Sequence, residues 1–407
     1  MTARRVPRWS EVRPLLQPRR TALNSTARRL AGAASIADLR LLARRRAPRA
    51  VFDYTDGAAG DELALRRSRQ VFERLEFMPH VLEDVSSVDT STVMLGRPAA
   101  APFGFAPTGF TRMLHTEGEP AVARVAQQAG IPYALSTMGT TSIEDLAAAA
   151  PDGRRWFQLY LWRDRPASRD FVARAQAAGY EALVLTVDTP VPGLRLRDVR
   201  NGLTIPPSLS LKTFAEAALH PAWWFDLFTT EPLEFASLKR SEGTLAELVA
   251  RLFDPAATVA DLAWLRSIWD GPLLVKGIVT EADARAVVDA GADAVVVSNH
   301  GGRQLDRAAT PLEALPSVLD AVGDRAEVYV DGGVMSGSDI VAAVALGARA
   351  ALVGRAYLYG LMAGGERGVR RAADILIREI AATLALLGVA RVSDLREDHV
   401  RIRRPQQ

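Results

Sequence analysis

A histidine, two glycines and an arginine directly follow a run of β-branched apolar residues in the stretch VVVSNHGGRQLD, residues 295–306. His300 can accept a proton near neutral pH, and Arg303 offers a planar fork that matches a carboxylate. Asp188, at the end of another apolar run, could fix the imidazole tautomer and stabilise its protonated form. Together these groups could remove a proton from a small acid. The alternative is that His300 is only a structural residue.

Eight short β-rich runs, each followed by a helix-like pattern, would position these groups. Eight such units predict an α/β protein with a closed (β/α)8 TIM barrel, in which the carboxyl ends of the strands face the substrate. The runs are PFGFAP (102–107), PYALST (132–137), RWFQLY (155–160), ALVLTVD (182–188), LLVKG (273–277), AVVVSNH (294–300), EVYVDGG (327–333) and AALVGR (350–355).

Nearly every predicted strand ends in a polar side chain or a glycine, which a purely structural barrel would not need. Glycines after the last two strands would let backbone N–H groups approach a ligand, and the loops there are the usual phosphate site of this fold. We therefore expect a phosphorylated cofactor or substrate. The strand-end residues are Thr108, Gly109, Ser136, Gln158, Tyr160, Thr186, Asp188, Lys276, Ser298, His300, Arg303, Asp331, Gly332, Gly333, Gly354 and Arg355.

Lys276 ends an otherwise apolar strand, so its ammonium group needs a negative partner. That partner is either an anionic ring system or, in a structural salt bridge, an aspartate of a neighbouring strand. No metal site is predicted, because no second histidine lies at ligand spacing from His300. The chain has no cysteine, which excludes disulfides, thiolate catalysis and cysteine-ligated metals.

The 407 residues divide into a basic N-terminal extension, residues 1–35, and a single barrel domain, residues 36–400. Within the domain we expect a helical N-terminal cap (36–100), whose first helix would begin after Ser35 as N-cap, and a long insertion after the fourth strand (about 191–271). The insertion contains PAWWFDLF, where Trp223, Trp224 and Phe225 are adjacent. They form a local core or subunit interface, or they anchor the protein at a membrane surface.

The net charge is only +3, but arginines are concentrated in the first 50 residues. Such an arm could contact an anionic membrane or be a solvated extension; nucleic-acid binding is not expected, because no aromatic interleaving accompanies the charge. No apolar run is long enough to span a bilayer, and no secretory signal follows the first arginines. We expect a cytoplasmic protein that rests on the cytoplasmic face of the membrane or is free of it.

The blocks FDYTDGA, APTG, HTEGE, FQLY, LTVDTP, RDVRNG, LVKG, SNHGGRQLD and DGG occur in this order. Together they resemble the FMN-dependent α-hydroxy acid dehydrogenases and oxidases over essentially residues 36–390. The details GFTRMLHTEGE, WWFDLFTTEP and VMSGSDI are most similar to actinobacterial quinone-type L-lactate dehydrogenases. The resemblance implies FMN as cofactor, oxidation of an L-2-hydroxy acid such as L-lactate to its 2-oxo acid, electron transfer to a quinone or another acceptor, and a homotetramer.

The resemblance also implies roles for single residues. His300 would be the catalytic base paired with Asp188, and Tyr160 would hydrogen-bond the substrate hydroxyl. The substrate carboxylate would be held by Tyr54, Arg195 and Arg303, and the substrate side chain would face Met138 and Phe110. The FMN ring and ribityl chain would contact Thr108, Gly109, Ser136, Gln158, Thr186, Lys276 and Ser298, and the phosphate end would contact Asp331, Gly333, Gly354 and Arg355.

Three positions depart from the family pattern. Met335 replaces an arginine expected two places after DGG, which leaves more of the phosphate binding to Arg355. Leu194 and Leu196 stand where charged residues are common. Gly109 replaces a frequent alanine beside the flavin, so an enzyme that uses oxygen, either an L-2-hydroxy acid oxidase or a lactate monooxygenase, remains an alternative. A mandelate-type dehydrogenase is the alternative for the substrate. Different classes are a non-redox flavin- or phosphate-binding barrel and a degenerate scaffold.

Overall fold

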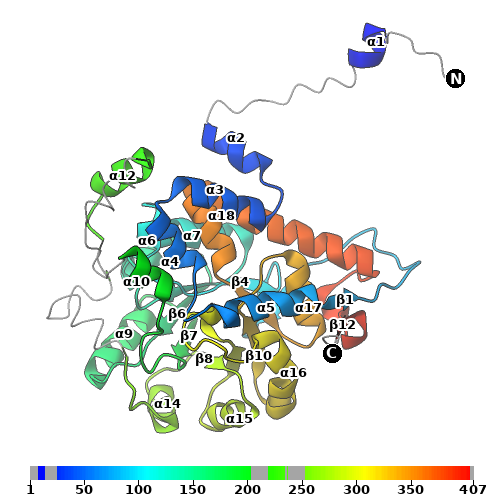
Figure 1. The fold of residues 1–407 in the computed structure, drawn as a ribbon. Helices are drawn as coiled ribbons and strands as arrows, with labels where there is room; N and C mark the ends of the chain where they lie inside the picture. The colour runs from blue at the N-terminus through cyan, green and yellow to red at the C-terminus, as the bar shows by residue number, and fades with distance from the viewer. Residues whose placement is uncertain (1–7, 14–24, 203–218, 234–235, 237–252, 404–407) are drawn as a thin grey trace.

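Eight parallel strands close into a barrel at the centre of the protein (Figure 1). The computed structural model describes residues 8–13, 25–202, 219–233, 236 and 253–403. The closed order β10-β11-β4-β5-β6-β7-β8-β9 confirms the predicted (β/α)8 barrel. The strands are β4 (Phe103–Phe105), β5 (Tyr133–Ser136), β6 (Arg155–Leu159), β7 (Ala182–Thr186), β8 (Leu273–Ile278), β9 (Ala294–Val297), β10 (Glu327–Asp331) and β11 (Ala350–Val353).

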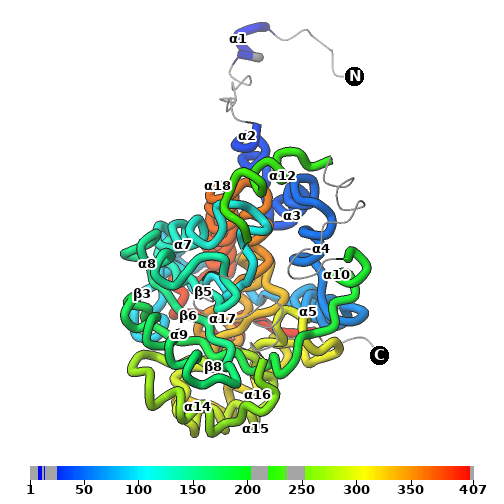
Figure 2. The backbone as a smooth tube through the Cα atoms, turned by 90° about the vertical axis from the view of Figure 1, so that its left-hand side faces the viewer, coloured from blue at the N-terminus to red at the C-terminus, as the bar shows by residue number. Residues whose placement is uncertain are grey.

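Helices surround the barrel and follow its strands (Figures 1 and 2). After β8, the segment EADARAVVD forms helix α15, and the Thr280 hydroxyl caps it by accepting from the Asp283 N–H. The surrounding helices are α6 (Thr111–Leu114), α7 (Gly118–Ala129), α8 (Ile143–Ala149), α9 (Arg165–Ala177), α15 (Glu281–Asp289), α16 (Pro311–Val322), α17 (Gly337–Ala345) and α18 (Arg355–Leu387), with short 3-10 turns η3 (His300–Gly302) and η4 (Gly323–Arg325).

The barrel interior is a separate hydrophobic cluster made of inward-facing strand residues. Side chains alternate along a strand, so Trp156, Val184, Leu274 and Tyr329 point inward while their neighbours face the helices. Trp156 and Tyr329 meet edge to face with ring centroids 5.9 Å apart. The hairpin of β2 (Thr92–Met94) and β3 (Arg97–Ala99) adds side chains to this cluster, so the barrel is filled rather than hollow below the site.

The N-terminal part of the chain forms a helical cap, as predicted. Ser35 caps the first long cap helix by accepting a hydrogen bond from the Asp38 N–H, and this helix packs along α18. Helix α18 is interrupted by non-helical backbone at Gly364 and Gly365. The cap contains α2 (Ser25–Gly32), α3 (Ile36–Arg46), α4 (Arg49–Asp56), α5 (Leu63–Glu73) and β1 (Leu75–Phe77), and α1 (Trp9–Val12) precedes it. Strand β1 pairs with β12 (Val400–Ile402) near the C-terminus. The turns η5 (Val392–Asp394) and η6 (Glu397–His399) come just before β12.

The connection between β7 and β8 is the long insertion predicted from the sequence. Its described helices are α10 (Leu196–Asn201), α12 (Pro221–Phe228) and α14 (Val259–Arg266); residues 203–218, 234–235 and 237–252 of the predicted insertion lie outside the described residues. Helix α12 lies beside α3, because Asp226 forms an ion pair with Arg46 at 2.7 Å. None of the described helices is long and apolar enough to cross a membrane.

Candidate active site

A cavity of about 200 Å³ lies at the carboxyl ends of the barrel strands. Side chains two positions apart on a strand face the same side. The residues two positions after the inward-facing apolar ones therefore also point inward, and they line the cavity above the apolar layer: Gln158, Thr186, Lys276 and Asp331. The predicted gathering of polar strand ends is therefore present in the structure.

The turn after β9 holds its histidine in an uncommon backbone conformation. His300, Gly301 and Gly302 all have positive φ, of 57°, 62° and 74°. A Cβ at Gly301 would lie 2.8 Å from an Arg355 nitrogen, and one at Gly302 would lie 2.8 Å from the Leu65 nitrogen, so only glycine fits at either position. This explains why the apolar strand is followed by histidine and two glycines. The turn places the imidazole at the cavity, and the glycines let the backbone pass close to the cap helix that carries Leu65.

His300 is paired with Asp188 from the loop after β7. His300 Nδ1 lies 2.9 Å from Asp188 Oδ1. Burial raises the pKa of Asp188, but the charge of His300, its hydrogen bond and the charge of Lys276 together outweigh burial and lower that pKa. The carboxylate is thus ionised at neutral pH and accepts from Nδ1–H, which leaves Nε2 as the free base nitrogen.

Arg303 and Arg195 lie on the ring of Tyr54. Their guanidinium carbons are 4.9 and 5.3 Å from the ring centroid. Arg195 also pairs with Asp198 at 3.0 Å, whereas Arg303 bonds only the backbone carbonyls of Tyr54 and Gly57 among the described residues. Burial and the neighbouring Arg195 lower the pKa of Arg303 to about 10, so it remains a cation at neutral pH. A half-buried cation without a carboxylate partner is suited to an anionic ligand.

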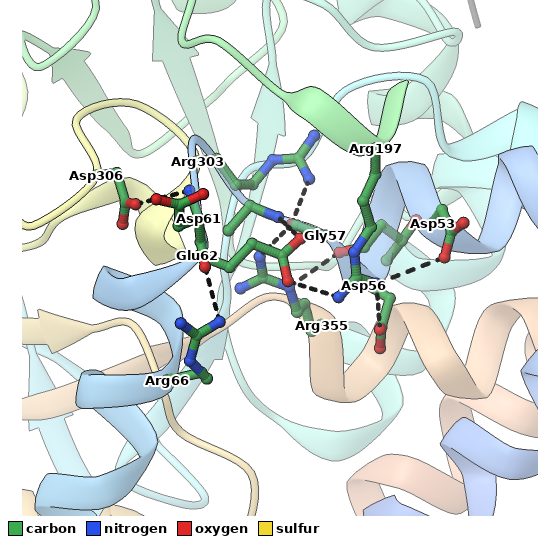
Figure 3. Close-up of polar contacts among 12 residues, drawn as sticks. Asp53, Asp56, Gly57, Asp61, Glu62, Arg66, Arg197, Arg303, Asp306 and Arg355 are labelled. Atoms are coloured by element: carbon green, nitrogen blue, oxygen red, sulfur yellow. Dashed lines mark hydrogen bonds and ion pairs between the residues drawn. The ribbon is translucent and has the colours of Figure 1, made fainter. Parts of the chain in front are cut away.

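An ion network fastens this cation pair to the cap (Figure 3). Arg197, in the first turn of α10, contacts Asp53 at 3.4 Å, Asp56 at 3.1 Å and Glu62 at 2.5 Å. Arg40 holds the other side of Asp56 with two hydrogen bonds of 2.6 and 2.9 Å. Because α4 carries Tyr54 and α10 begins just after Arg195, this network sets the position of both. No sequence pattern indicated this network, because Arg40 and Arg197 are distant along the chain from the carboxylates that they contact.

Lys276 has the partner that the structural alternative foresaw. Its Nζ lies 2.9 Å from Asp331 Oδ2 and donates to Ser298 Oγ at 2.8 Å. Burial lowers the pKa of Lys276, but the charges of Asp331 and Asp188 outweigh it and raise the pKa. The ammonium group is therefore charged, and it also faces the cavity.

Arg355 is a second half-buried cation of the cavity. Its guanidinium donates to the carbonyls of Thr55, Gly57 and Gly301 at 2.9, 2.7 and 2.9 Å, and no carboxylate pairs with it among the described residues. Gly333 and Met335 also line the cavity. The cavity therefore offers this arginine and close-lying backbone to a phosphate group.

Unpaired buried atoms test whether a flavin fits. Gln158 Nε2, Thr186 Oγ1 and Asp331 Oδ1 are buried and have no hydrogen-bond partner among the described residues, and all three residues line the cavity. Unpaired buried polar atoms are costly, so a ligand with both donors and acceptors is expected there. A flavin ring with its ribityl chain has both, and the cation of Lys276 suits the negative charge of its reduced form. The residues fit FMN.

The cavity brings together most of the predicted residues. Three do not line it: Phe110, Asp188 and Ser298. Phe110 is buried in the hydrophobic core, with a positive backbone φ of 58° just before α6. Asp188 and Ser298 instead hydrogen-bond two residues that do line the cavity, His300 and Lys276 respectively. The predicted residues that line the cavity are Tyr54, Thr108, Gly109, Ser136, Met138, Gln158, Tyr160, Thr186, Arg195, Lys276, His300, Arg303, Asp331, Gly333, Gly354 and Arg355.

Sequence reasoning missed several apolar lining residues. Leu114, Leu358 and Phe253 line the cavity, and the Phe253 ring lies 5.7 Å from that of Tyr160. Phe253 belongs to the insertion, which the sequence indicated only as a general source of substrate contacts. Gln304 was also missed: it accepts from the Gly193 N–H and donates to the Val191 carbonyl, so it fixes the loop beyond Asp188.

Of the two alternatives for the aromatic cluster of the insertion, the two tryptophans form a local core. Trp223 and Trp224 are only 8% and 9% exposed, and Trp223 Nε1 donates to the Met113 carbonyl at 3.0 Å. Phe225 and Phe228 are instead 69% and 63% exposed. The cluster is thus a local core on one face and an apolar surface on the other.

The sequence matches the family described as FMN-dependent dehydrogenase across residues 43–402. The chain belongs to the FMN-dependent dehydrogenase family. It is therefore an enzyme that uses FMN, and the His300 cavity lies where the barrel of such an enzyme carries its site.

Two relatives and one solved structure show which members of the family the chain resembles. The chain is 57% identical over 397 residues to the "Putative L-lactate dehydrogenase" of Mycobacterium tuberculosis, covering 98% of this chain and 96% of that protein. It is 42% identical to the L-lactate oxidase of a Nostoc species, over 87% of this chain and 94% of that protein. A crystal structure of the monotopic membrane protein (S)-mandelate dehydrogenase superposes with a TM-score of 0.88 at 40% identity, covering 91% of this chain and all of that chain.

Proposed function

We propose that this FMN-dependent dehydrogenase oxidises L-lactate to pyruvate and passes the electrons to a quinone. The observation that carries the proposal is the pairing of His300 with Asp188 beside a cavity that Arg303 also lines. Arg303 is a half-buried cation with no carboxylate partner among the described residues. A base and an anion clamp in one cavity suit a small 2-hydroxy acid. The relatives named for L-lactate support the choice of substrate.

Arg303 and Arg195 hold the substrate carboxylate in this proposal, with the Tyr54 hydroxyl beside them. Neither the Tyr54 nor the Tyr160 hydroxyl bonds another group in the described part of the chain, and both residues line the cavity. Tyr160 then hydrogen-bonds the substrate hydroxyl. Burial raises the pKa of Tyr160, so its hydroxyl stays protonated and can donate.

His300 takes the substrate proton on Nε2, and Asp188 stabilises the resulting imidazolium. When bound, FMN supplies the acceptor for the two electrons that leave the substrate. The FMN ring and ribityl chain would be held by Thr108, Gly109, Ser136, Gln158, Thr186, Lys276 and Ser298, and the phosphate end by Asp331, Gly333, Gly354 and Arg355.

The apolar residues that line the cavity are also compatible with a second class of substrate. Met138, Leu114 and Phe253 line the cavity, and these side chains could also contact an aromatic substrate group. The structural match to (S)-mandelate dehydrogenase supports (S)-mandelate as the alternative substrate.

The visible spectrum of the purified protein tests the proposal. It is recorded without oxygen before and after L-lactate, with D-lactate as the control, and air is admitted last. Bleaching of the flavin band by the L-isomer alone would support the reaction, and slow recovery in air would support a dehydrogenase over an oxidase. Flavin that bleaches with (S)-mandelate but not with L-lactate would overturn the substrate. Protein that binds no added FMN would favour the scaffold alternative.

We further propose that the enzyme rests on the cytoplasmic face of a membrane as a homo-oligomer. The exposed Phe225 and Phe228 of α12 lie close to α3, whose Arg44 and Arg45 are also exposed. Aromatic and basic groups together suit an anionic lipid surface. The monotopic description of the mandelate dehydrogenase structure supports this placement. The homotetramer implied by the family resemblance is tested by light scattering during size-exclusion chromatography.

A further inference from the structure

A second cavity adjoins the first, on the outer side of the barrel wall formed by β7 and β8. Its volume is about 350 Å³, within the range of roughly 300–1,000 Å³ that is usual for small-molecule sites. The outward-facing strand residues Leu185, Val187 and Val275 form one wall, and Leu262 of α14 and Ala286 of α15 face them. We refer to it as the β7–β8 cavity.

The insertion accounts for this space. In a (β/α)8 barrel, the helix that follows a strand normally packs over the groove beside that strand. Here the chain leaves β7 into the insertion, and α14 reaches the wall only shortly before β8 begins. The rim stays accessible, because Val187 and Val259 are 43% and 47% exposed.

The two cavities share part of their lining. Tyr160, Thr186 and Thr189 line both, so a wall about one side chain thick separates them. Thr189 is only 7% exposed, and its hydroxyl bonds no other group in the described ranges. It is therefore a buried donor with a cavity on either side.

The remaining polar groups of the β7–β8 cavity are already paired. Asp254 forms an ion pair with Arg165 at 2.9 Å, and Asp283 accepts from the Thr280 hydroxyl at 2.7 Å. What is left is aliphatic surface with hydroxyl donors toward the reaction cavity. Such a lining suits a flat apolar molecule that carries carbonyl oxygens on its ring.

We propose that the β7–β8 cavity binds the quinone ring of the second electron acceptor, with the Thr189 hydroxyl donating to a ring carbonyl and the apolar tail leaving between Val187 and Val259. The inference rests on the proposed function, which requires an acceptor after the substrate has reduced the enzyme. Oxidation of the hydroxy acid releases two electrons and two protons; the quinone takes up both of each and leaves as the hydroquinone. The substrate and the quinone thus occupy separate cavities.

The substitution Ala286→Trp tests the site by filling it. We expect reoxidation of the lactate-reduced enzyme by 2-methyl-1,4-naphthoquinone to slow at least about tenfold, while bleaching by L-lactate stays within about twofold of wild type. Ala282→Trp is the matched control: Ala282 is an exposed residue of the same helix, α15, and lines neither cavity. Val259→Trp at the rim is a second variant if Ala286→Trp folds poorly.

Binding without turnover gives an independent readout. The oxidised enzyme is dialysed against 2-methyl-1,4-naphthoquinone with and without oxalate, a small dicarboxylate that would occupy the arginine clamp. Quinone binding that persists with oxalate and is lost in Ala286→Trp supports the inference. Displacement of the quinone by oxalate, or wild-type reoxidation of Ala286→Trp, overturns it. Failure of L-lactate to bleach the flavin overturns the proposed function instead, and the dialysis still decides whether the cavity binds quinone.

Discussion

Arg303 and Arg355 are half-buried cations that bond only backbone carbonyls among the described residues. A partly desolvated charge without a counter-charge is costly, so both positions favour a bound anion. Both side chains line the cavity of the His300 base, and both donate to the Gly57 carbonyl. At the scale of single residues, these two arginines therefore form one cationic region that suits the anionic groups of substrate and cofactor.

The substitution His300→Gln tests the proposed base. Glutamine keeps polarity near Asp188 but cannot take a proton at neutral pH, so we expect the rate of flavin bleaching by L-lactate to fall by about 10²–10⁴-fold. The flavin spectrum should persist, because His300 is not expected to hold the cofactor. His220→Gln, at the start of α12 and outside the cavity, should bleach at the wild-type rate. If His300→Gln kept more than about a tenth of that rate, another residue would be the base.

The substitution Met335→Arg restores the arginine that the family pattern has at this position and tests whether it would bind the FMN phosphate. Met335 lines the cavity, and its backbone N–H donates to Asp339 at 2.7 Å. An arginine there adds a charge-assisted contact to the phosphate, so we expect FMN to bind about tenfold more tightly to the apoprotein. Fluorescence titration with FMN measures this, with Met335→Leu as the control of unchanged charge. Equal affinity in all three proteins would show that the phosphate does not reach this position.

At the scale of elements, the cap and the insertion hold the substrate end together. The backbone N–H groups of Ala59 and Gly60 donate to the carbonyls of Gly302 and Leu194, which join the loop after α4 to the turn after β9 and to the start of the insertion. The Arg197 network adds the ionic link between α10 and α4. The barrel alone therefore does not complete the site.

The substitution Arg197→Met tests this link. It leaves the largely buried carboxylates of Asp53, Asp56 and Glu62 with fewer counter-charges; because Arg197 is one-third exposed, we expect a loss of about 1–3 kcal/mol in the free energy of unfolding. The KM for L-lactate should rise severalfold more than kcat changes, since Arg195 precedes α10. Urea unfolding and steady-state kinetics measure both.

Arg200→Met is the matched control for that experiment. Arg200 lies on the same helix, is exposed and forms no ion pair with another described residue. Its removal should leave unfolding free energy and KM near wild type. An equal KM change in both variants would mean that helix α10, rather than its ion network, sets the position of Arg195.

At the scale of the whole molecule, helices α12 and α3 lie at the same end (Figure 2). Phe225 and Phe228 of α12 and Arg44 and Arg45 of α3 are exposed. Leu41 of α3 is also exposed, at 49%. The opposite face of α12 is fixed to the protein by Trp223 and by the ion pair of Asp226 with Arg46. A surface held in this way can contact a membrane without rearrangement of the barrel.

The double substitution Phe225→Ser and Phe228→Ser tests that surface. Loss of two exposed rings removes apolar area that a membrane would bury, so we expect binding to phosphatidylglycerol vesicles to fall at least about tenfold in flotation. Flavin bleaching by L-lactate should be unchanged. The pair Val81→Ser and Leu82→Ser, equally exposed but in the segment after β1, is the control. Wild-type protein that does not float with the vesicles would contradict the membrane proposal.

The amino-acid sequence by itself determined the eight strands, the polar strand ends and the NHGG turn. Period-two alternation is a local property, so the residue that follows an inward apolar residue by two positions must also face inward. The same logic places Gln158 above Trp156 and Lys276 above Leu274. The positive φ of Gly301 and Gly302 is also a local backbone property that favours glycine, which is why the motif was readable, whereas the contacts with Arg355 and Leu65 are tertiary.

Only the tertiary structure decided which distant residues meet. The Trp223 indole donates to the carbonyl of Met113, which is far away in the sequence, and Lys276 of β8 pairs with Asp331 of β10, with β9 between them. The side of the chain to which Phe110 turns, the Arg197 network and the β7–β8 cavity depend likewise on how the insertion and the cap pack on the barrel. Such contacts follow from the shape and charge of separate segments, and no periodicity within one segment encodes them.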